Sequence, residues 1–120
     1  MMEPGRSVDS GALDRLLDMT GGDPEFVDEL IQTYLDDGVV QLAAMHAAAI
    51  ASSAAELVRP AHSLKGNSAN MGAEQLVELC RQLEADARSG AVERATERVA
   101  AAAAEFERVR TELAALRVAK

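Results

Sequence analysis

The segment from Ala61 to Ala73 carries the residues best suited to group-transfer chemistry, and His62 is its most reactive side chain. Near neutral pH an imidazole is largely uncharged and keeps a lone pair on one ring nitrogen. Residues three and four positions apart are neighbours on a helix. A helix here would therefore place Arg59 one turn before His62, and Lys65 and Gly66 one turn after it.

Gly66 is unusual in this segment because a glycine inside a helix costs about 1 kcal/mol relative to alanine. Such local inconsistencies often mark functional sites. Beside an exposed His62, a glycine would leave room for a large partner to approach the ring. Two plainer interpretations remain open: His62 is an ordinary solvated residue, or Gly66 permits close packing of helices.

The other candidate residues are weaker. His46 is followed one turn later by Ala49 and Ile50, so it lacks a cationic neighbour and is interpreted as structural or incidental. Cys80 lies on an apolar stripe and is expected to be a buried packing residue. Neither histidine follows a glutamate by three positions, so the paired Glu-x-x-His pattern of a carboxylate-bridged metal site is absent from the sequence.

Apolar residues recur at helical spacing along most of the chain, and the last stripe holds a three-four alternation over 25 residues. Asp23 and Ser53 are predicted to cap helices. The segment Asp36–Gly38 is expected to bend its helix or shift its stripe, and Pro60 to kink its helix or separate the first turn. The predicted helices run from Asp9 or Ser10 to Gly21, from Asp23 to Ile50, from Ser53 to Met71, from Ala73 to Ala87 and from Val92 to Leu116.

Short connections between these helices predict an all-α fold, an antiparallel up-down four-helix bundle with a short N-terminal capping helix. Residues 1–8 contain Pro4 and Gly5 without helical spacing, so we expect a flexible leader there. The bundle domain is expected to span residues 9–118.

Composition restricts the function further. The 120 residues include 12 Lys and Arg against 20 Asp and Glu, a net charge of −8. This balance argues against nucleic acid or an anionic membrane surface as a partner. No apolar run approaches the roughly 18 residues of a membrane span, and the start of the chain lacks a signal-peptide core. A single cysteine fits a cytoplasmic protein. The excess of Arg over Lys and the 24 alanines are typical of GC-rich bacterial genomes.

The segment around His62 resembles the histidine-containing phosphotransfer (HPt) family, whose motif is His-x-x-Lys-Gly followed by small residues and a second glycine. Here the motif is His62, Lys65, Gly66 and then Gly72. The resemblance extends over residues 9–118. It includes Leu76, Leu79, Cys80, Leu83 and Glu84, and the segment Gly21–Phe26.

The resemblance implies that His62 accepts a phosphoryl group from the aspartyl phosphate of a receiver domain and passes it to another receiver. Lys65 would hold the phosphoryl oxygens. The receiver would supply Mg²⁺, and this chain would need no cofactor of its own. Such a protein is a phosphohistidine carrier of a two-component phosphorelay, without kinase activity or a nucleotide site.

A neighbour for the imidazole can be expected from the helical hairpin that turns near Gly72. On the second helix, Gln82 lies level with His62, and Arg81 and Glu84 lie within one turn. The family often carries Gln or Glu at the position of Glu84, hydrogen-bonded to the ring, so the resemblance favours Glu84 as the residue that orients His62. A solvated Glu84 is the alternative. Further positive potential is expected from Arg88, and partner docking from Met19, Leu16 and Ser63.

Two other interpretations remain. In the first alternative, the chain is a non-phosphorylated helical docking module for receivers or kinases. In the second, it is the dimerisation domain of a sensor kinase. The second would require an ATP-binding domain, and the sequence shows no nucleotide motif. We expect a monomer whose partners are receiver domains of response regulators or hybrid kinases. The sequence does not distinguish a stand-alone protein from a fragment of a larger kinase.

Overall fold

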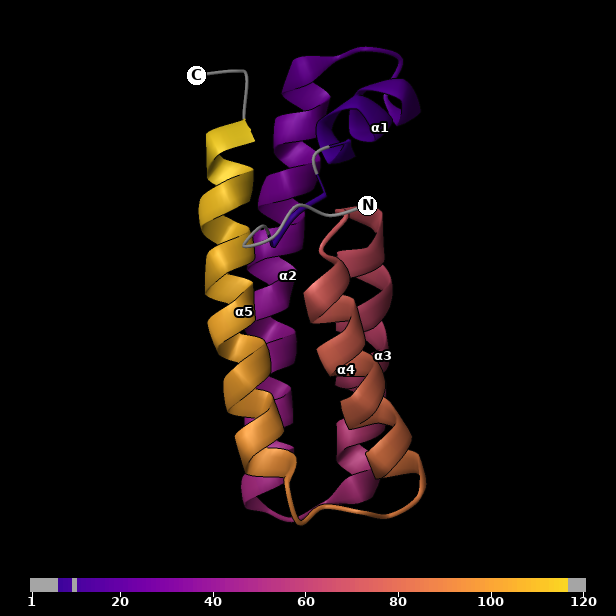
Figure 1. The fold of residues 1–120 in the computed structure, drawn as a ribbon, viewed down its shortest axis with the longest axis vertical. Helices are drawn as coiled ribbons and strands as arrows, with labels where there is room; N and C mark the ends of the chain where they lie inside the picture. The colour runs from indigo at the N-terminus through magenta and orange to yellow at the C-terminus, as the bar shows by residue number, and fades with distance from the viewer. Residues whose placement is uncertain (1–6, 10, 117–120) are drawn as a thin grey trace.

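The computed structural model describes residues 7–9 and 11–116, and these form five α-helices and no strand. The helices are α1 (Ala12–Met19), α2 (Pro24–Ile50), α3 (Ala54–Asn70), α4 (Glu74–Arg88) and α5 (Ala95–Leu116). The all-α prediction is confirmed. The four longer helices lie side by side in a molecule of 43 × 26 × 19 Å, and the short α1 lies beside the start of α2 (Figure 1).

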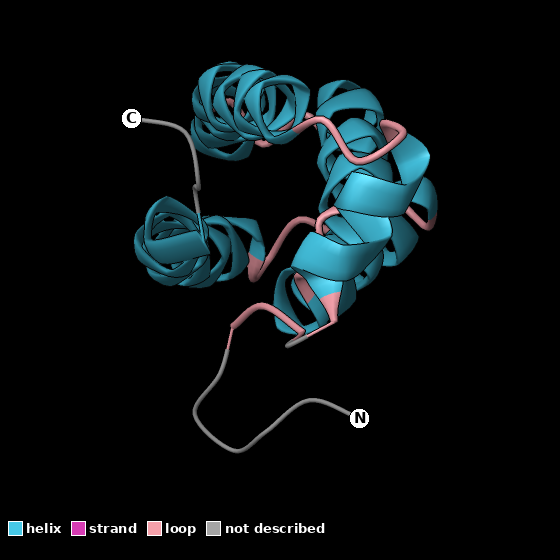
Figure 2. Ribbon diagram, turned by 90° about the horizontal axis from the view of Figure 1, so that it is seen from above, coloured by secondary structure: helices cyan, strands magenta, loops and turns pink. Residues whose placement is uncertain are grey.

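The four longer helices enclose one interior. Helix α2 packs against α3 and α5, and α4 packs against the same two helices, while α1 contacts α2. Figure 2, viewed along the long axis, shows these helices arranged around a common centre. Each helix therefore turns one side inward and leaves the other side open to partners.

The starts of α2 and α3 are fixed by side-chain caps, as predicted. The Asp23 carboxylate accepts hydrogen bonds from the backbone N–H groups of Glu25 and Phe26, at 3.0 and 3.3 Å. The Ser53 hydroxyl accepts one from the N–H of Glu56 at 3.3 Å. These bonds satisfy backbone donors that the first turn of a helix leaves unpaired.

Neither predicted interruption ends a helix. Helix α2 runs through Gly38, and α3 runs through Pro60 without a separate first turn. A Cβ atom at Gly38 would overlap the Cε1 and Cζ atoms of Phe106 on α5. Gly38 is therefore a packing glycine that lets the Phe106 ring lie against the backbone of α2.

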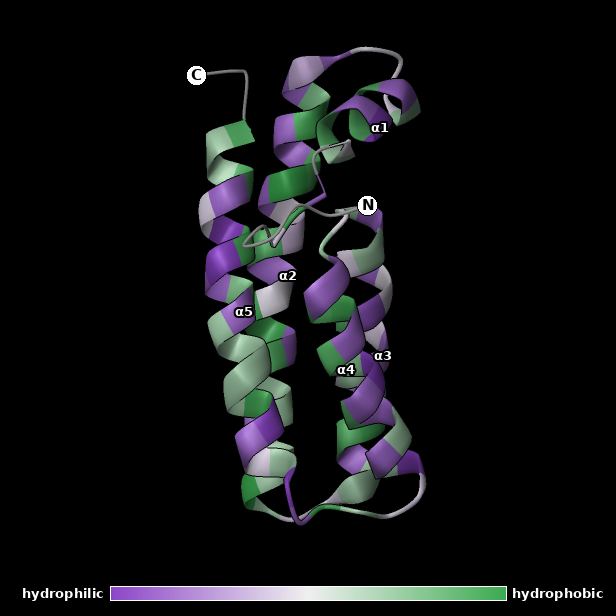
Figure 3. Ribbon diagram, in the orientation of Figure 1, coloured by the Kyte–Doolittle hydropathy of each residue, from purple (hydrophilic) through white to green (hydrophobic). Residues whose placement is uncertain are grey.

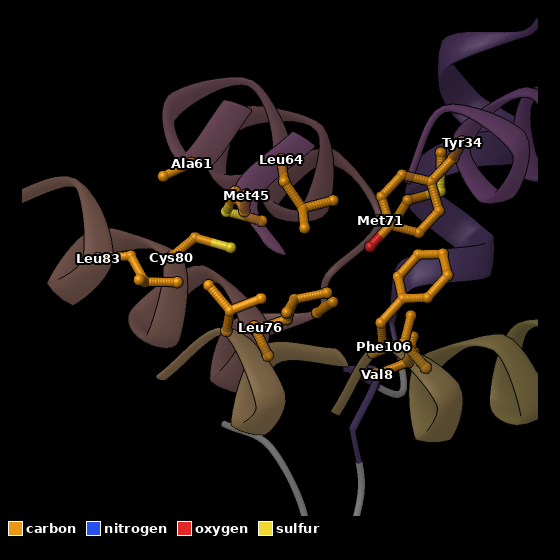
Figure 4. Close-up of a cluster of buried hydrophobic side chains, with 14 of the residues drawn as sticks. Val8, Tyr34, Met45, Ala61, Leu64, Met71, Leu76, Cys80, Leu83 and Phe106 are labelled. Carbon is orange, nitrogen blue, oxygen red and sulfur yellow. The ribbon is translucent and has the colours of Figure 1, made fainter. Parts of the chain in front are cut away.

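The interior contains aliphatic side chains and few aromatic ones. Apolar and polar residues alternate along the long helices in Figure 3, as expected for helices with one buried side. In Figure 4 the rings of Tyr34 and Phe106 lie next to each other, with centroids 5.9 Å apart. The Tyr34 hydroxyl shares a 2.7 Å hydrogen bond with Ser68 of α3. Cys80 is fully buried, and this burial raises the pKa of its thiol to about 12, which agrees with a packing role.

The predicted leader was too long, because Ser7 and Val8 are buried. Their backbone N–H groups donate to the two carboxylate oxygens of Glu112 on α5, each at 2.8 Å. The N–H of Asp9 donates to the carbonyl of Gly72 in the turn between α3 and α4. This segment thus joins α5 to that turn. Residues 1–6 of the predicted leader, and residues 117 and 118 of the predicted domain, lie outside the described residues.

Within residues 7–9 and 11–116, no helix combines the length and apolar character needed to cross a lipid bilayer.

Candidate functional site

Helix α3 presents His62 to solvent because its other side is committed to the interior. Ala61 and Leu64 are fully buried, whereas the His62 side chain is 62% exposed. Helix α3 then turns at Gly72, whose φ of +73° is readily adopted only by glycine. A Cβ atom there would also approach Ala12 and Arg15. This tight turn brings α4 back along α3 and sets the residues that face His62.

Glu84 of α4 lies at the centre of the site. One of its carboxylate oxygens, Oε2, lies 2.9 Å from Nδ1 of His62 and 2.7 Å from a guanidinium nitrogen of Arg88. The other oxygen, Oε1, lies 2.7 Å from Nζ of Lys65. The Glu84 side chain is 8% exposed, so its oxygens are held in place while the surrounding nitrogens face outward.

The charge of Glu84 determines which ring nitrogen of His62 donates to it. The hydrogen bonds from Lys65 first, and then from Arg88, lower the pKa of Glu84 to about 2, against the smaller opposing effect of burial. An ionised carboxylate can only accept hydrogen bonds, so Nδ1 of His62 is the donor. In the neutral ring Nε2 then carries the lone pair. Among the residues that the structure describes, Nε2 has no hydrogen-bond partner.

Gly66 lies one turn beyond His62, and its surroundings decide between two interpretations left open by the sequence. A Cβ atom at Gly66 would meet nothing within 4 Å. Close helix packing, which explains Gly38, therefore does not explain Gly66. The absent side chain leaves open space beside the imidazole instead.

The structure separates the remaining candidates. Arg88 joins the cluster through Glu84, whereas Arg59 is exposed and has no partner among the described residues. Arg81 and Gln82 were expected at the same level of α4 as Glu84, but both have other partners. Arg81 pairs with Glu78, and the Gln82 side chain accepts a hydrogen bond from Arg98 at 2.6 Å. The exposed His46 of α2 likewise has no partner among the described residues.

The three docking residues expected from the sequence have different outcomes. The prediction that Leu16 takes part in docking was wrong, because Leu16 is 1% exposed and its side chain belongs to the core. Met19 is 68% exposed. Ser63 lines a groove of about 450 Å³ between α2 and α3. This groove was not predicted from the sequence, although the polar residues Ser63, Asn67 and Asn70 recur on α3 at helical spacing and indicate a polar stripe next to His62.

Comparisons with known proteins identify the family to which this chain belongs. A sequence model of the Hpt domain matches residues 29–119. The chain belongs to the Hpt domain family. The crystal structure of histidine-containing phosphotransfer protein B from Pseudomonas aeruginosa PAO1 is similar, with a TM-score of 0.86 and 33% sequence identity. That match covers 94% of this Hpt chain and 96% of the other. Among curated proteins, no relative is matched.

Membership of the Hpt family, together with the likeness to a histidine-containing phosphotransfer protein, gives this protein its function in a two-component phosphorelay. Hpt proteins interact with receiver domains and act as phosphotransfer carriers.

Proposed function

We propose that Nε2 of His62 is the atom that accepts the phosphoryl group from a receiver aspartyl phosphate and later returns it to another receiver. The observation that carries this proposal is the bond between Nδ1 and Glu84 on a side chain that is 62% exposed. One ring nitrogen is oriented by a fixed carboxylate, and the other points away from it with its lone pair available.

Each neighbouring residue has a specific part in this proposal. Glu84 holds the ring in the tautomer that leaves Nε2 nucleophilic. Lys65, 29% exposed and one turn away, reaches the oxygens of the incoming group as a cation. Gly66 leaves space for the receiver surface that delivers the group. The Mg²⁺ ion belongs to the acidic pocket of the receiver, and this chain contributes no cofactor.

We extend the proposal to architecture and setting. The four packing pairs among α2, α3, α4 and α5 support an antiparallel up-down four-helix bundle, with α1 as a short cap. We propose a monomer that acts in the cytoplasm as a carrier and has neither kinase activity nor a nucleotide site. Arg59 contacts none of the residues around Glu84 in the described structure, and its part in the transfer step stays a prediction.

The test is phosphotransfer from a labelled phospho-receiver with Mg²⁺ to four proteins: the wild type, His62→Gln, His46→Gln and Lys65→Ala. The wild type and His46→Gln are expected to take up label, and His62→Gln is expected to take up none while its helicity is unchanged. Lys65→Ala is expected to slow the transfer. Label on His62→Gln would place the acceptor elsewhere, and receiver binding by the wild type without any label would favour the docking-module alternative.

A further inference from the structure

One carboxylate in the site serves three nitrogen groups, and this sharing has consequences for phosphorylation. Lys65 and Arg88 are both bound to Glu84 in the unmodified protein, at 2.7 Å each. Both cations are therefore already occupied before a phosphoryl group arrives. The Glu84 side chain is 8% exposed, whereas Arg88 is 60% exposed. The carboxylate is the fixed partner, and the guanidinium can turn toward solvent without any change in the helices.

A phosphoryl group on His62 changes the balance of charge around these cations. It brings up to two negative charges and three strong acceptor oxygens to the ring that already contacts Glu84. The phosphoryl oxygens and the carboxylate then compete for Lys65 and Arg88. Resting on the function proposed above, we infer that Glu84 is a positioning residue that limits the lifetime of the phosphohistidine. It holds back both cations and keeps a negative charge beside the ring.

The balance of the transfer step supports this direction. The Nε2 lone pair forms the new N–P bond while the P–O bond to the receiver aspartate breaks, and that electron pair leaves with the aspartate carboxylate. Nδ1 keeps its proton, so the phosphorylated ring carries a positive charge next to Glu84. A protonated imidazole is the better leaving group in the return step. The carboxylate thus favours the labile form of the ring and aids transfer in both directions.

An amide at position 84 distinguishes the effects of the carboxylate charge from its role in orienting the His62 ring. Glutamine can accept the same hydrogen bond from Nδ1–H, but it carries no charge, and neutral hydrogen bonds are about half as strong as charged ones. The ring would keep its orientation and lose the adjacent negative charge. Lys65 and Arg88 would be released to the phosphoryl oxygens. Both changes lengthen the life of the N–P bond, and the loss of the negative charge beside the ring slows transfer.

The experiment compares the wild type with Glu84→Gln, and uses Glu78→Gln as a matched control, since Glu78 is exposed on the same helix and pairs with Arg81. The proteins are phosphorylated chemically with phosphoramidate, and phosphate at His62 is followed by mass spectrometry. Glu84→Gln is expected to retain it about tenfold longer and to accept it from a receiver about tenfold more slowly. Glu78→Gln is expected to match the wild type in both measurements.

A second comparison isolates the cations. In a Lys65→Met, Arg88→Met background, Glu84→Gln is expected to lengthen the lifetime less than in the wild type, because there are no cations left to release. An unchanged or shorter lifetime in folded Glu84→Gln would overturn the inference. An equal gain in both backgrounds would overturn the part assigned to the cations. A wild type that accepts no phosphate at His62 from any receiver would instead contradict the proposed function itself.

Discussion

Substitutions at Gly66 are predicted to raise the stability of the protein, and a large side chain there is predicted to slow phosphotransfer. Glycine inside a helix is unfavourable by about 1 kcal/mol relative to alanine. The open surroundings of Gly66 mean that a new Cβ meets no atom within 4 Å. Gly66→Ala is therefore expected to stabilise the protein by about 1 kcal/mol. With an unfolding entropy of about 2.1 cal/mol/K per residue, a chain of 120 residues gains about 4 °C in Tm.

The same position is predicted to be sensitive in transfer, because the receiver must approach the imidazole over it. Gly66→Gln adds a larger side chain with good helix propensity, so it is also expected to stabilise the protein, while slowing transfer from a phospho-receiver at least about tenfold. Thermal unfolding and the transfer rate are measured on the same preparations. Destabilisation by alanine would refute the structural reasoning, and an undiminished transfer rate in Gly66→Gln would refute the role in access.

The remaining predictions concern packing, the N-terminal segment and acid. Gly38→Ala is expected to destabilise the protein by about 1–3 kcal/mol in urea unfolding, because its Cβ overlaps Phe106; a gain in stability would contradict the packing described here. Glu112→Ala leaves two buried N–H groups without their acceptor and is expected to lower the free energy of unfolding by about 2 kcal/mol. Substitution of the exposed Glu107 by Ala is expected to change it by less than about 0.5 kcal/mol. Equal effects would refute the anchoring of residues 7 and 8. The pKa of Glu84 is held at about 2, below its value in the unfolded chain. The contribution of this carboxylate to stability is therefore present above about pH 4.5 and is lost as the pH falls toward 2. The stability difference between the wild type and Glu84→Gln is therefore expected to shrink by about 1 kcal/mol between pH 5.5 and pH 3, after allowance for partly exposed partners; a constant difference would contradict the ion-pair account.

Much of the fold could be predicted because the helices obey local rules. Asp23 and Ser53 cap helices through bonds between residues two or three positions apart, which a sequence displays directly. Helix α3 runs through Pro60, so the separate first turn predicted there was wrong, while the predicted kink stays a prediction. The packing role of Gly38 could not be predicted, because it depends on a ring from α5, 68 positions away along the chain.

The parts that could not be predicted depend on contacts between distant residues. The bond between Ser7 and Glu112 joins positions 105 apart, and no local pattern marks either partner. Leu16 and Met19 both lie on the short α1, but only packing determines that Leu16 faces the core.

At the site, the hairpin geometry predicted which part of α4 lies level with His62, but it did not predict which residue there contacts the ring. The rotation of α4 about its axis brings Glu84 to the imidazole and directs Gln82 toward Arg98. That rotation is set by the packing of the whole helix, so the resemblance to a family was needed to favour Glu84. The pairing of Arg88 with Glu84 follows the ordinary spacing of four residues and could have been expected.

The central claim is that one nitrogen of one side chain carries the phosphoryl group. Phosphorus and nitrogen NMR of the ¹⁵N-labelled protein, after phosphorylation by a receiver, tests it most directly. We expect a phosphorus–nitrogen coupling to Nε2 of His62, with the proton on Nδ1 retained. A coupling to Nδ1, or to a ring nitrogen of His46, would contradict it.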